Sequence, residues 1–220
     1  MQTQTIQLIN LAIGKPKEMR YGSEEKILNT AIQKEIVKEA YLMKEGFIGD
    51  GVADLVNHGG LDRAVCFYPA EHYSFWEADY GKTLDSAAFG ENITISGLDE
   101  RTICIGDILQ IGEATVQITE GRVPCKTIDR RTGMEKQFKK MIETGYTGYF
   151  GKVLKEGKVR FDDSISIISR HEDAVTVYQA HQIYFRQIVD EETLQQLITN
   201  PSLSDNWLQH LKRLLKGAES

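Results

Sequence analysis

Residues 103–119 read ICIGDILQIGEATVQIT, and this stretch decides the fold class. Two short apolar runs, at 103–111 and 115–119, stand on either side of a turn at Gly112-Glu113. Apolar and polar residues alternate from Val116 to Ile118, which is typical of a half-buried strand. The stretch therefore predicts short strands separated by a tight turn.

The same pattern extends over the first 170 residues. Further short apolar runs, separated by turns rich in Gly and Asp, cover 6–13, 64–68, 92–95 and 164–168. Many short strands with glycines between them predict a barrel or a sandwich rather than a doubly wound sheet. We therefore expect a mostly β fold.

Helical patterns interrupt the β pattern twice and then replace it. The stretch 69–80 has a proline at a plausible first helical position, and 134–144 carries one apolar stripe on a polar helix. After residue 170, amphipathic patterns at 173–185 and 190–198 are followed by a third that begins with Ser204 as its N-cap. We expect a β domain over 1–169 and a three-helix subdomain over 170–220, packed partly on the barrel.

Composition and charge exclude several classes of protein. The chain has 220 residues, 41% hydrophobic and 26% charged, which excludes disordered and collagen-like proteins. We expect no membrane segment and no secretory signal, because no apolar run reaches about 18 residues. Three widely spaced cysteines argue against a disulfide framework and for a cytoplasmic location. The net charge of −6 disfavours general binding to nucleic acid.

Positive charge and a reactive side chain coincide in Gly121-Arg122-Val123-Pro124-Cys125-Lys126-Thr127, with Arg130 and Arg131 close behind. Neighbouring cations favour the thiolate, which is both the nucleophile and the metal ligand. Pro124 restricts the backbone and would hold Cys125 rigidly. Most free cysteines are small buried hydrophobes, but a turn rich in cations is a poor place for that role. The stretch favours a functional Cys125.

Other candidate residues give weaker signals. The glycines of His58-Gly59-Gly60 would let the backbone approach a ligand closely, although a simple hairpin turn is the plainer interpretation. Asn92 and Thr94 share one face of a predicted strand, which would either bind a polar ligand or face water. Cys66 and Cys104 lie within apolar runs and are predicted to be core residues. No spacing of histidines and cysteines predicts a zinc site.

Taken in order, these motifs resemble the MOSC-domain family, named after the C-terminal domain of molybdenum-cofactor sulfurase. The segments that carry the resemblance are Thr30-Ala-Ile-Gln-Lys34, Gly49-Asp50, His58-Gly59-Gly60 with Ala64-Val65, Tyr68-Pro69-Ala-Glu-His72-Tyr73, Phe89-Gly90-Glu91-Asn92, Ile105-Gly106-Asp107, Arg122-x-Pro124-Cys125-Lys126 and Thr144-Gly145-x-x-Gly148-Tyr149. The tail from Val175 to Leu215 resembles the three-helix appendage of one bacterial branch. The resemblance implies a MOSC-type β-barrel with accessory helices, followed by this small subdomain.

The resemblance also implies a site for the molybdenum cofactor. In the family the cysteine of the Arg-x-Pro-Cys motif is the protein ligand to molybdenum, which assigns both the metal-ligand and the catalytic role to Cys125. A soft thiolate suits a metal already held by the dithiolene sulfurs of the pterin. Cations and backbone N–H groups would hold the pterin phosphate, and the candidates are Arg122, Lys34 and the turn His58-Gly59-Gly60. Asn92 and Thr94 are candidate hydrogen-bond partners of the pterin.

This branch is similar to reductases of N-hydroxylated small molecules, including hydroxylaminopurine-like base analogues, hydroxylamines and amidoximes. The implied activity is a molybdenum-dependent, pyridoxal phosphate-independent oxidoreductase that detoxifies such bases. Electrons would come from a separate reductase, since the chain has no flavin, haem or iron–sulfur motif.

Two alternatives stay open from the sequence. In one, Cys125 carries sulfur or the molybdenum cofactor without substrate turnover. In the other, the protein is an interaction module whose helices bind a partner. The helices could also contact the electron donor, shield the pocket or form a homodimer, and the sequence does not separate these roles.

Overall fold

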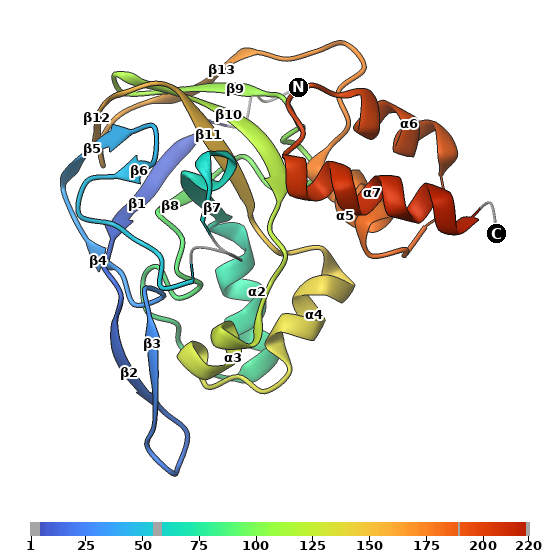
Figure 1. Cartoon of the computed structure of the whole chain (residues 1–220). Helices are drawn as coiled ribbons and strands as arrows, with labels where there is room; N and C mark the ends of the chain where they lie inside the picture. The colour runs from blue at the N-terminus through green and yellow to red at the C-terminus, as the bar shows by residue number, and fades with distance from the viewer. Residues whose placement is uncertain (1–4, 55–58, 189, 219–220) are drawn as a thin grey trace.

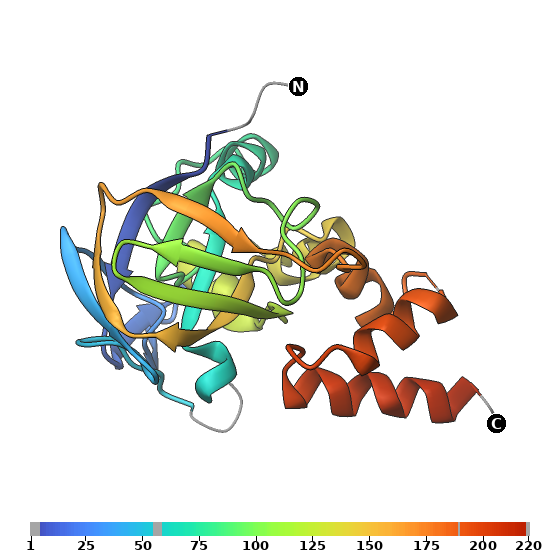
Figure 2. The same cartoon turned by 90° about the horizontal axis from the view of Figure 1, so that it is seen from above.

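Eight strands form one sheet that curls into a half-barrel (Figures 1 and 2). In sheet order they are β13 (Ile165–Ser169), β9 (Ile108–Ile111), β10 (Ala114–Gly121), β11 (Tyr149–Lys155), β7 (Val65–Pro69), β8 (Ile93–Ser96), β1 (Gln7–Ile13) and β4 (Glu35–Ile36). This computed structural model describes residues 5–54, 59–188 and 190–218. Only the β7–β8 pair is parallel among these neighbours. An isolated bridge between Gln7 and Ser164 brings the β1 and β13 sides of the curled sheet together.

Two smaller sheets extend this frame. One contains β12 (Gly157–Arg160), β5 (Glu39–Met43) and β6 (Gly46–Phe47), and the other is the hairpin of β2 (Lys17–Tyr21) and β3 (Lys26–Thr30). The hairpin projects away from the barrel in Figure 1. The predicted strand at 103–111 is shorter than expected and begins at Ile108, because the Asp107 carboxylate accepts a hydrogen bond from the Cys104 N–H at 2.8 Å and closes a turn.

Helices α2 (Glu71–Tyr80), α3 (Lys126–Thr132) and α4 (Gln137–Thr144) lie together at one end of the barrel (Figure 1). They share a core of Tyr68, Trp76, Phe89, Ile128 and Met141. The predictions of α2 and α4 are confirmed. Pro69 is not the first helical residue, however: it ends strand β7, and Ala70 is the N-cap.

The chain ends in three helices, as predicted: α5 (Val177–Tyr184), α6 (Glu191–Thr199) and α7 (Asp205–Ala218). Their side chains belong to the same core as the barrel strands, since Val177 and Trp207 join the cluster that contains Ile118. The core is therefore continuous across the predicted boundary near residue 170. Even the longest described helix, α7 with 14 residues, is too short and too polar to cross a membrane.

Two glycines of the barrel make room for aromatic rings from these helices. A Cβ atom at Gly121, at the end of β10, would lie 3.1 Å from the Trp207 indole. A Cβ atom at Gly145, the C-cap of α4, would lie 2.7 Å from the Tyr178 ring. Real Cβ atoms essentially never approach as closely as the second distance, so the helices fit because these two side chains are absent.

Candidate functional site

A cavity of about 580 Å³ collects most of the predicted site residues. Its volume is within the range of about 300–1,000 Å³ that is usual for small-molecule pockets. The predicted residues that line it are Lys34, Gly59, Gly60, Asn92, Arg122 and Cys125. His58 lies outside the described residues. Thr94 is not among the lining residues: it is buried, and its hydroxyl donates to the Glu91 carboxylate at 2.9 Å.

Cys125 is held at the cavity wall by the junction between a strand and a helix. Strand β10 ends at Gly121, and Cys125 is the N-cap residue of α3, with extended backbone angles of φ −126° and ψ 163°. Its carbonyl accepts a hydrogen bond from the Ile128 N–H at 3.1 Å. Cys125 is partly exposed and lines the cavity. This position contradicts the alternative in which Cys125 is a small buried hydrophobe.

Arg122 places a cation in the same wall. Its backbone N–H donates to the Gly148 carbonyl at 2.9 Å, which fixes the end of β10 against β11. Burial opposes its charge, yet the neighbouring Cys66 and Cys125 thiols hold the pKa of Arg122 above its ordinary value. Within the described part of the chain, its buried Nη1 has no hydrogen-bond partner. A buried donor without a partner is unfavourable, and an anionic group in the cavity would satisfy it.

Lys34 and Asn92 meet at a carboxylate that the sequence did not single out. The Lys34 ammonium forms an ion pair with Asp50, which also accepts hydrogen bonds from the Gly14 N–H and from Asn92 Nδ2, both at 2.8 Å. Asn92 Oδ1 accepts from the Cys66 N–H at 3.1 Å, and Nδ2 also donates to a β1 carbonyl at 3.2 Å. The Asn92 amide thus joins Asp50, the β7 backbone and the β1 backbone. The only sequence signal for Asp50 was the Gly49-Asp50 turn.

Arg63 is a second guanidinium in the wall, and it has a different environment from Arg122. It ends the 3₁₀ turn η1 (Leu61–Arg63), which follows Gly60, a residue with φ of +113°. Its Nε donates to the Glu120 carboxylate at 2.5 Å. Burial raises the pKa of the Glu120 carboxyl above its ordinary value, against the opposing effect of the Arg63 charge. No local sequence pattern pointed to Glu120.

Cys66 is buried as predicted, but it is not confined to the core. The cavity reaches it, so two of the three cysteines line the same space. Burial raises the pKa of the Cys66 thiol, and the nearby Arg122 charge opposes that change. At neutral pH this buried thiol is therefore a weaker candidate for a thiolate ligand than its free pKa would suggest. Cys104 is also buried and does not line the cavity.

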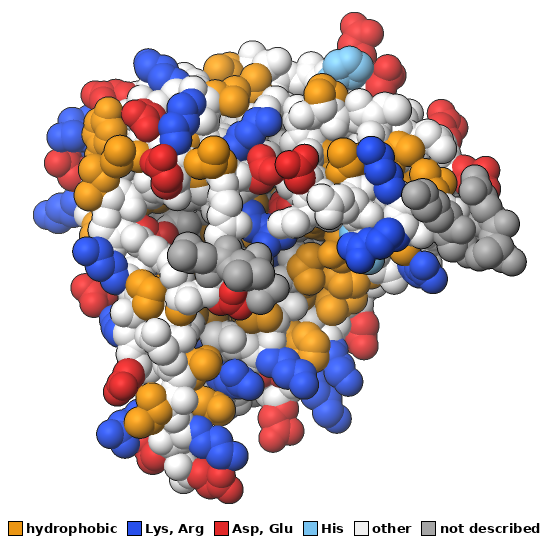
Figure 3. Space-filling view, viewed as in Figure 1, with side chains coloured by type: hydrophobic (Ala, Val, Ile, Leu, Met, Phe, Trp, Pro, Cys, Tyr) orange, Lys and Arg blue, Asp and Glu red, His pale blue; other side chains and the backbone are white. Residues whose placement is uncertain are grey.

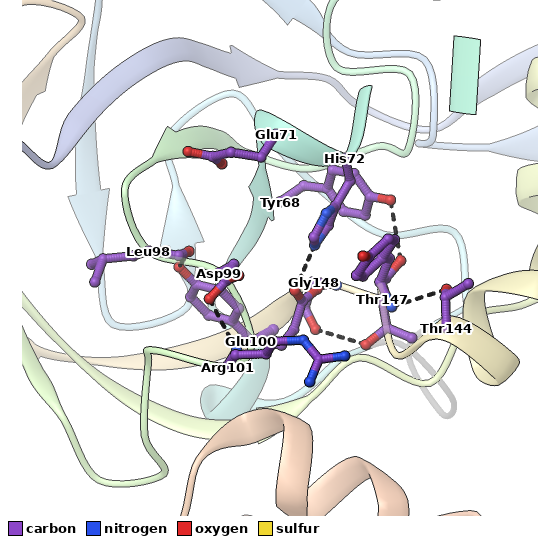
Figure 4. A network of polar contacts seen from close by, with 12 residues as sticks. Tyr68, Glu71, His72, Leu98, Asp99, Glu100, Arg101, Thr144, Thr147 and Gly148 are labelled. Atoms are coloured by element: carbon purple, nitrogen blue, oxygen red, sulfur yellow. Dashed lines mark hydrogen bonds and ion pairs between the residues drawn. The ribbon is translucent and has the colours of Figure 1, made fainter. Parts of the chain in front are cut away.

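A buried polar network joins α2 to the strand end that precedes Tyr149 (Figure 4). His72 Nε2 contacts the Glu100 carboxylate at 2.6 Å, and Glu100 accepts from the Gly148 N–H at 2.6 Å. The Gly148 carbonyl in turn accepts from the Arg122 N–H. None of His72, Glu100 and Gly148 lines the cavity. The network is connected to the site through the backbone that carries Arg122.

The four cations near Cys125 are close in sequence but do not converge in the structure. Arg122 lines the cavity, whereas Lys126 and Arg130 are exposed on α3. Arg131 forms an ion pair with Asp85 at 3.0 Å. Lys and Arg side chains gather over α3 and α4 in Figure 3. The helix turns successive cations to different sides, and the sequence did not predict α3.

Comparison with known proteins identifies the family. The MOSC domain matches residues 54–166, and the YiiM-like, 3-alpha helix domain matches residues 175–218. YflK of Bacillus subtilis (strain 168), an uncharacterized protein, is 39% identical over 94% of this chain and 93% of its own length. Protein YiiM of Escherichia coli (strain K12) is 34% identical over 81% of each chain.

Solved structures agree with this assignment. The crystal structure of YiiM from Geobacillus stearothermophilus has a TM-score of 0.79 and 28% identity, covering 94% of this chain and 98% of that one. A more distant relative, from Gibberella moniliformis (strain M3125 / FGSC 7600), is named a reductase; it is 27% identical over 96% of this chain, which covers 38% of that protein. The chain belongs to the MOSC family and carries its YiiM-like three-helix domain, so the family and fold predictions are confirmed.

Proposed function

We propose that this MOSC-family chain binds the molybdenum cofactor in the cavity and reduces N-hydroxylated compounds, with Cys125 as the protein ligand to molybdenum. The observation that carries the proposal is that the Cys125 thiol and the Arg122 guanidinium, with its Nη1 lacking a hydrogen-bond partner among the described residues, line one cavity. Membership of the MOSC family and a distant relative that is named a reductase support it.

The residues present fit the cofactor. Its phosphate is an anion, and Arg122 Nη1 is a buried donor that needs one. Gly59 and Gly60 bring backbone to the wall without side chains between it and the ligand. Within the described ranges, no group of three or more His, Cys, Asp or Glu residues could hold a metal ion. A metal that arrives with its own sulfur ligands needs only one soft side chain, and Cys125 supplies it.

When bound, the cofactor supplies the two-electron reduction of an N–OH group, which consumes two protons and releases the amine and water. The protein orients and surrounds the reacting groups. Cys125 would hold the metal at the N-cap of α3, and Arg122 would balance negative charge on the bound ligand. Asp50 holds Lys34 and Asn92 in place in the wall. We propose that a separate reductase delivers the electrons.

The test is to produce the protein in a host that makes the cofactor and to compare it with Cys125→Ala. We expect about one molybdenum per chain by elemental analysis, and anaerobic reduction of an N-hydroxylated purine with a chemical electron donor. Cys125→Ala should lose both. Cys104→Ala is the matched control, because Cys104 is a free cysteine that does not line the cavity. Fully loaded and active Cys125→Ala protein would overturn the proposal.

The same preparations separate the sulfur-carrier alternative. A sulfane-sulfur adduct on Cys125 in metal-free protein, found by mass spectrometry in the absence of reductase activity, would favour that alternative. Wild-type protein that carries neither molybdenum nor an adduct would contradict both functions.

A further inference from the structure

We propose that the three C-terminal helices support one wall of the cavity from outside it: Ser204 fixes Glu120, and Glu120 positions the Arg63 guanidinium to bind an anionic group of the ligand. The identity of that ligand rests on the proposed function. The contacts that carry the inference do not, because they lie within the chain.

The first contact joins the helices to the barrel. The Ser204 hydroxyl donates to Glu120 Oε2 and accepts from the Trp207 N–H at 3.3 Å, so one side chain caps α7 and binds the barrel carboxylate. The Ser204 N–H also donates to the Thr119 carbonyl at 3.1 Å. The exposed fractions are 2% for Ser204 and 0% for Glu120, so water does not compete for this bond.

The second contact joins Glu120 to the cavity. Its Oε1 accepts from Arg63 Nε at 2.5 Å, and the Arg63 side chain is 13% exposed. A guanidinium is planar, so a carboxylate fixed at Nε sets the orientation of the whole group. The Thr119 hydroxyl donates to the Asp62 carbonyl at 2.6 Å, which holds the η1 backbone against β10 as well.

Packing places the helices against the same strand end. The residue after Glu120 is Gly121, where the Trp207 indole occupies the position beside the missing side chain. Arg122 follows directly, and Cys125 stands three residues further on. The helices therefore pack directly beside the segment that carries Arg122 and Cys125. This gives the appendage a role different from partner binding, shielding or dimerisation.

The test uses sulfate, a tetrahedral dianion, titrated calorimetrically into the cofactor-free protein. Binding to a loosened Arg63 must first order its side chain, so Ser204→Ala should weaken sulfate about three- to tenfold. Arg63→Gln should weaken it at least as much. The decisive measurement is the double variant: if Ser204 acts through Arg63, then Ser204→Ala has no further effect in the Arg63→Gln background. Full additivity of the two effects would overturn the proposal.

Two matched variants separate positioning from general loosening of the helices. Ser204→Thr keeps the hydroxyl and should restore wild-type sulfate affinity. Asp190→Ala removes the N-cap of α6, at the other end of the three-helix unit, and should leave sulfate affinity unchanged. Equal weakening by Asp190→Ala would contradict the inference. Because no molybdenum is present, these results stand or fall separately from those obtained with Cys125→Ala.

Discussion

The two guanidinium groups in the cavity wall, those of Arg63 and Arg122, differ in their hydrogen-bond partners. Arg63 forms an ion pair with Glu120, which is itself bound to Ser204 of the C-terminal helices. Arg122 is held through its backbone, and its Nη1 is buried without a hydrogen-bond partner among the described residues. Arg63 is therefore oriented by a carboxylate of the fold before any ligand binds. Arg122 is stabilised fully only when a ligand supplies the missing acceptor.

Removing the Glu120 side chain should have the largest effect on stability. Glu120→Ala leaves Arg63 largely buried without its carboxylate, which should lower the free energy of unfolding by about 3–5 kcal/mol. Urea denaturation measures the loss. The matched control is Arg122→Gln, because Arg122 forms no ion pair with the residues that the structure describes. If Glu120→Ala costs less than about 1 kcal/mol, the ion pair does not distinguish the two cations.

Arg122→Gln should affect ligand binding and leave stability nearly unchanged. A hydrogen bond to a charged group contributes about 1.5–3 kcal/mol, so cofactor affinity should fall about tenfold or more. Molybdenum content after dialysis measures this effect, and thermal denaturation should show no loss of stability. Lys126→Gln is the control, because Lys126 is exposed beside the cavity. Unchanged molybdenum retention in Arg122→Gln would contradict the role given to its unpartnered donor.

Acid should loosen the helices before it disturbs the strands that carry Arg122. His181 on α5 is buried, donates from Nε2 to the Ile142 carbonyl at 2.8 Å, and has its pKa lowered by burial. The unfolded state therefore binds more protons once the pH falls below the ordinary histidine value of about 6.5. Stability should then decline with falling pH, by at most about 1.4 kcal/mol per pH unit for one group.

His181→Asn should flatten that decline between about pH 7 and pH 5, measured by denaturation at each pH. His171→Asn is the control, because His171 is exposed at the start of the segment that leads into α5. A wild-type protein whose stability does not change over this range would show that proton uptake at His181 does not act on the helices.

Asp190→Ala should have the smallest effect. It removes the N-cap of α6, where the carboxylate accepts from the Thr193 N–H at 3.3 Å, and should lower stability by about 1 kcal/mol. The contacts of Arg63 and Arg122 should be unchanged, so molybdenum retention should equal that of the wild type. A loss of retention would show that the whole three-helix unit, and not the Ser204 contact, controls the wall.

The sequence was sufficient to predict strands and helices wherever the pattern of buried residues is local. Alternation in β10 and the apolar stripes of α5 to α7 predicted strands and helices, since each presents one buried face. The α3 segment was missed because it buries only Ile128. The β2–β3 hairpin was missed for the same reason, since Met19 and Thr30 are the only residues of its two strands that are buried.

The candidate site could be predicted only in part. Cys125 and Arg122 were found because they are neighbours in one motif. Glu120 was not found, and Ser204 was predicted only as an N-cap, because their partners are distant in sequence: Arg63 and Glu120 are 57 residues apart, and Glu120 and Ser204 are 84. Asp50 appeared only as part of the Gly49-Asp50 turn. Alternation along the strand placed Thr94 on one face but could not show whether that face lines a cavity. It also could not show that the Asn92 amide already has hydrogen-bond partners within the chain.

Gly121 and Gly145 carry a consequence for related barrels. Each leaves space for one aromatic ring from the helices, Trp207 at the first position and Tyr178 at the second. A MOSC barrel with large side chains at both positions cannot accept a helical unit seated in this way. A barrel with small residues at both positions could accept this helical unit by grafting. A barrel with large residues there would first need substitutions at these two positions.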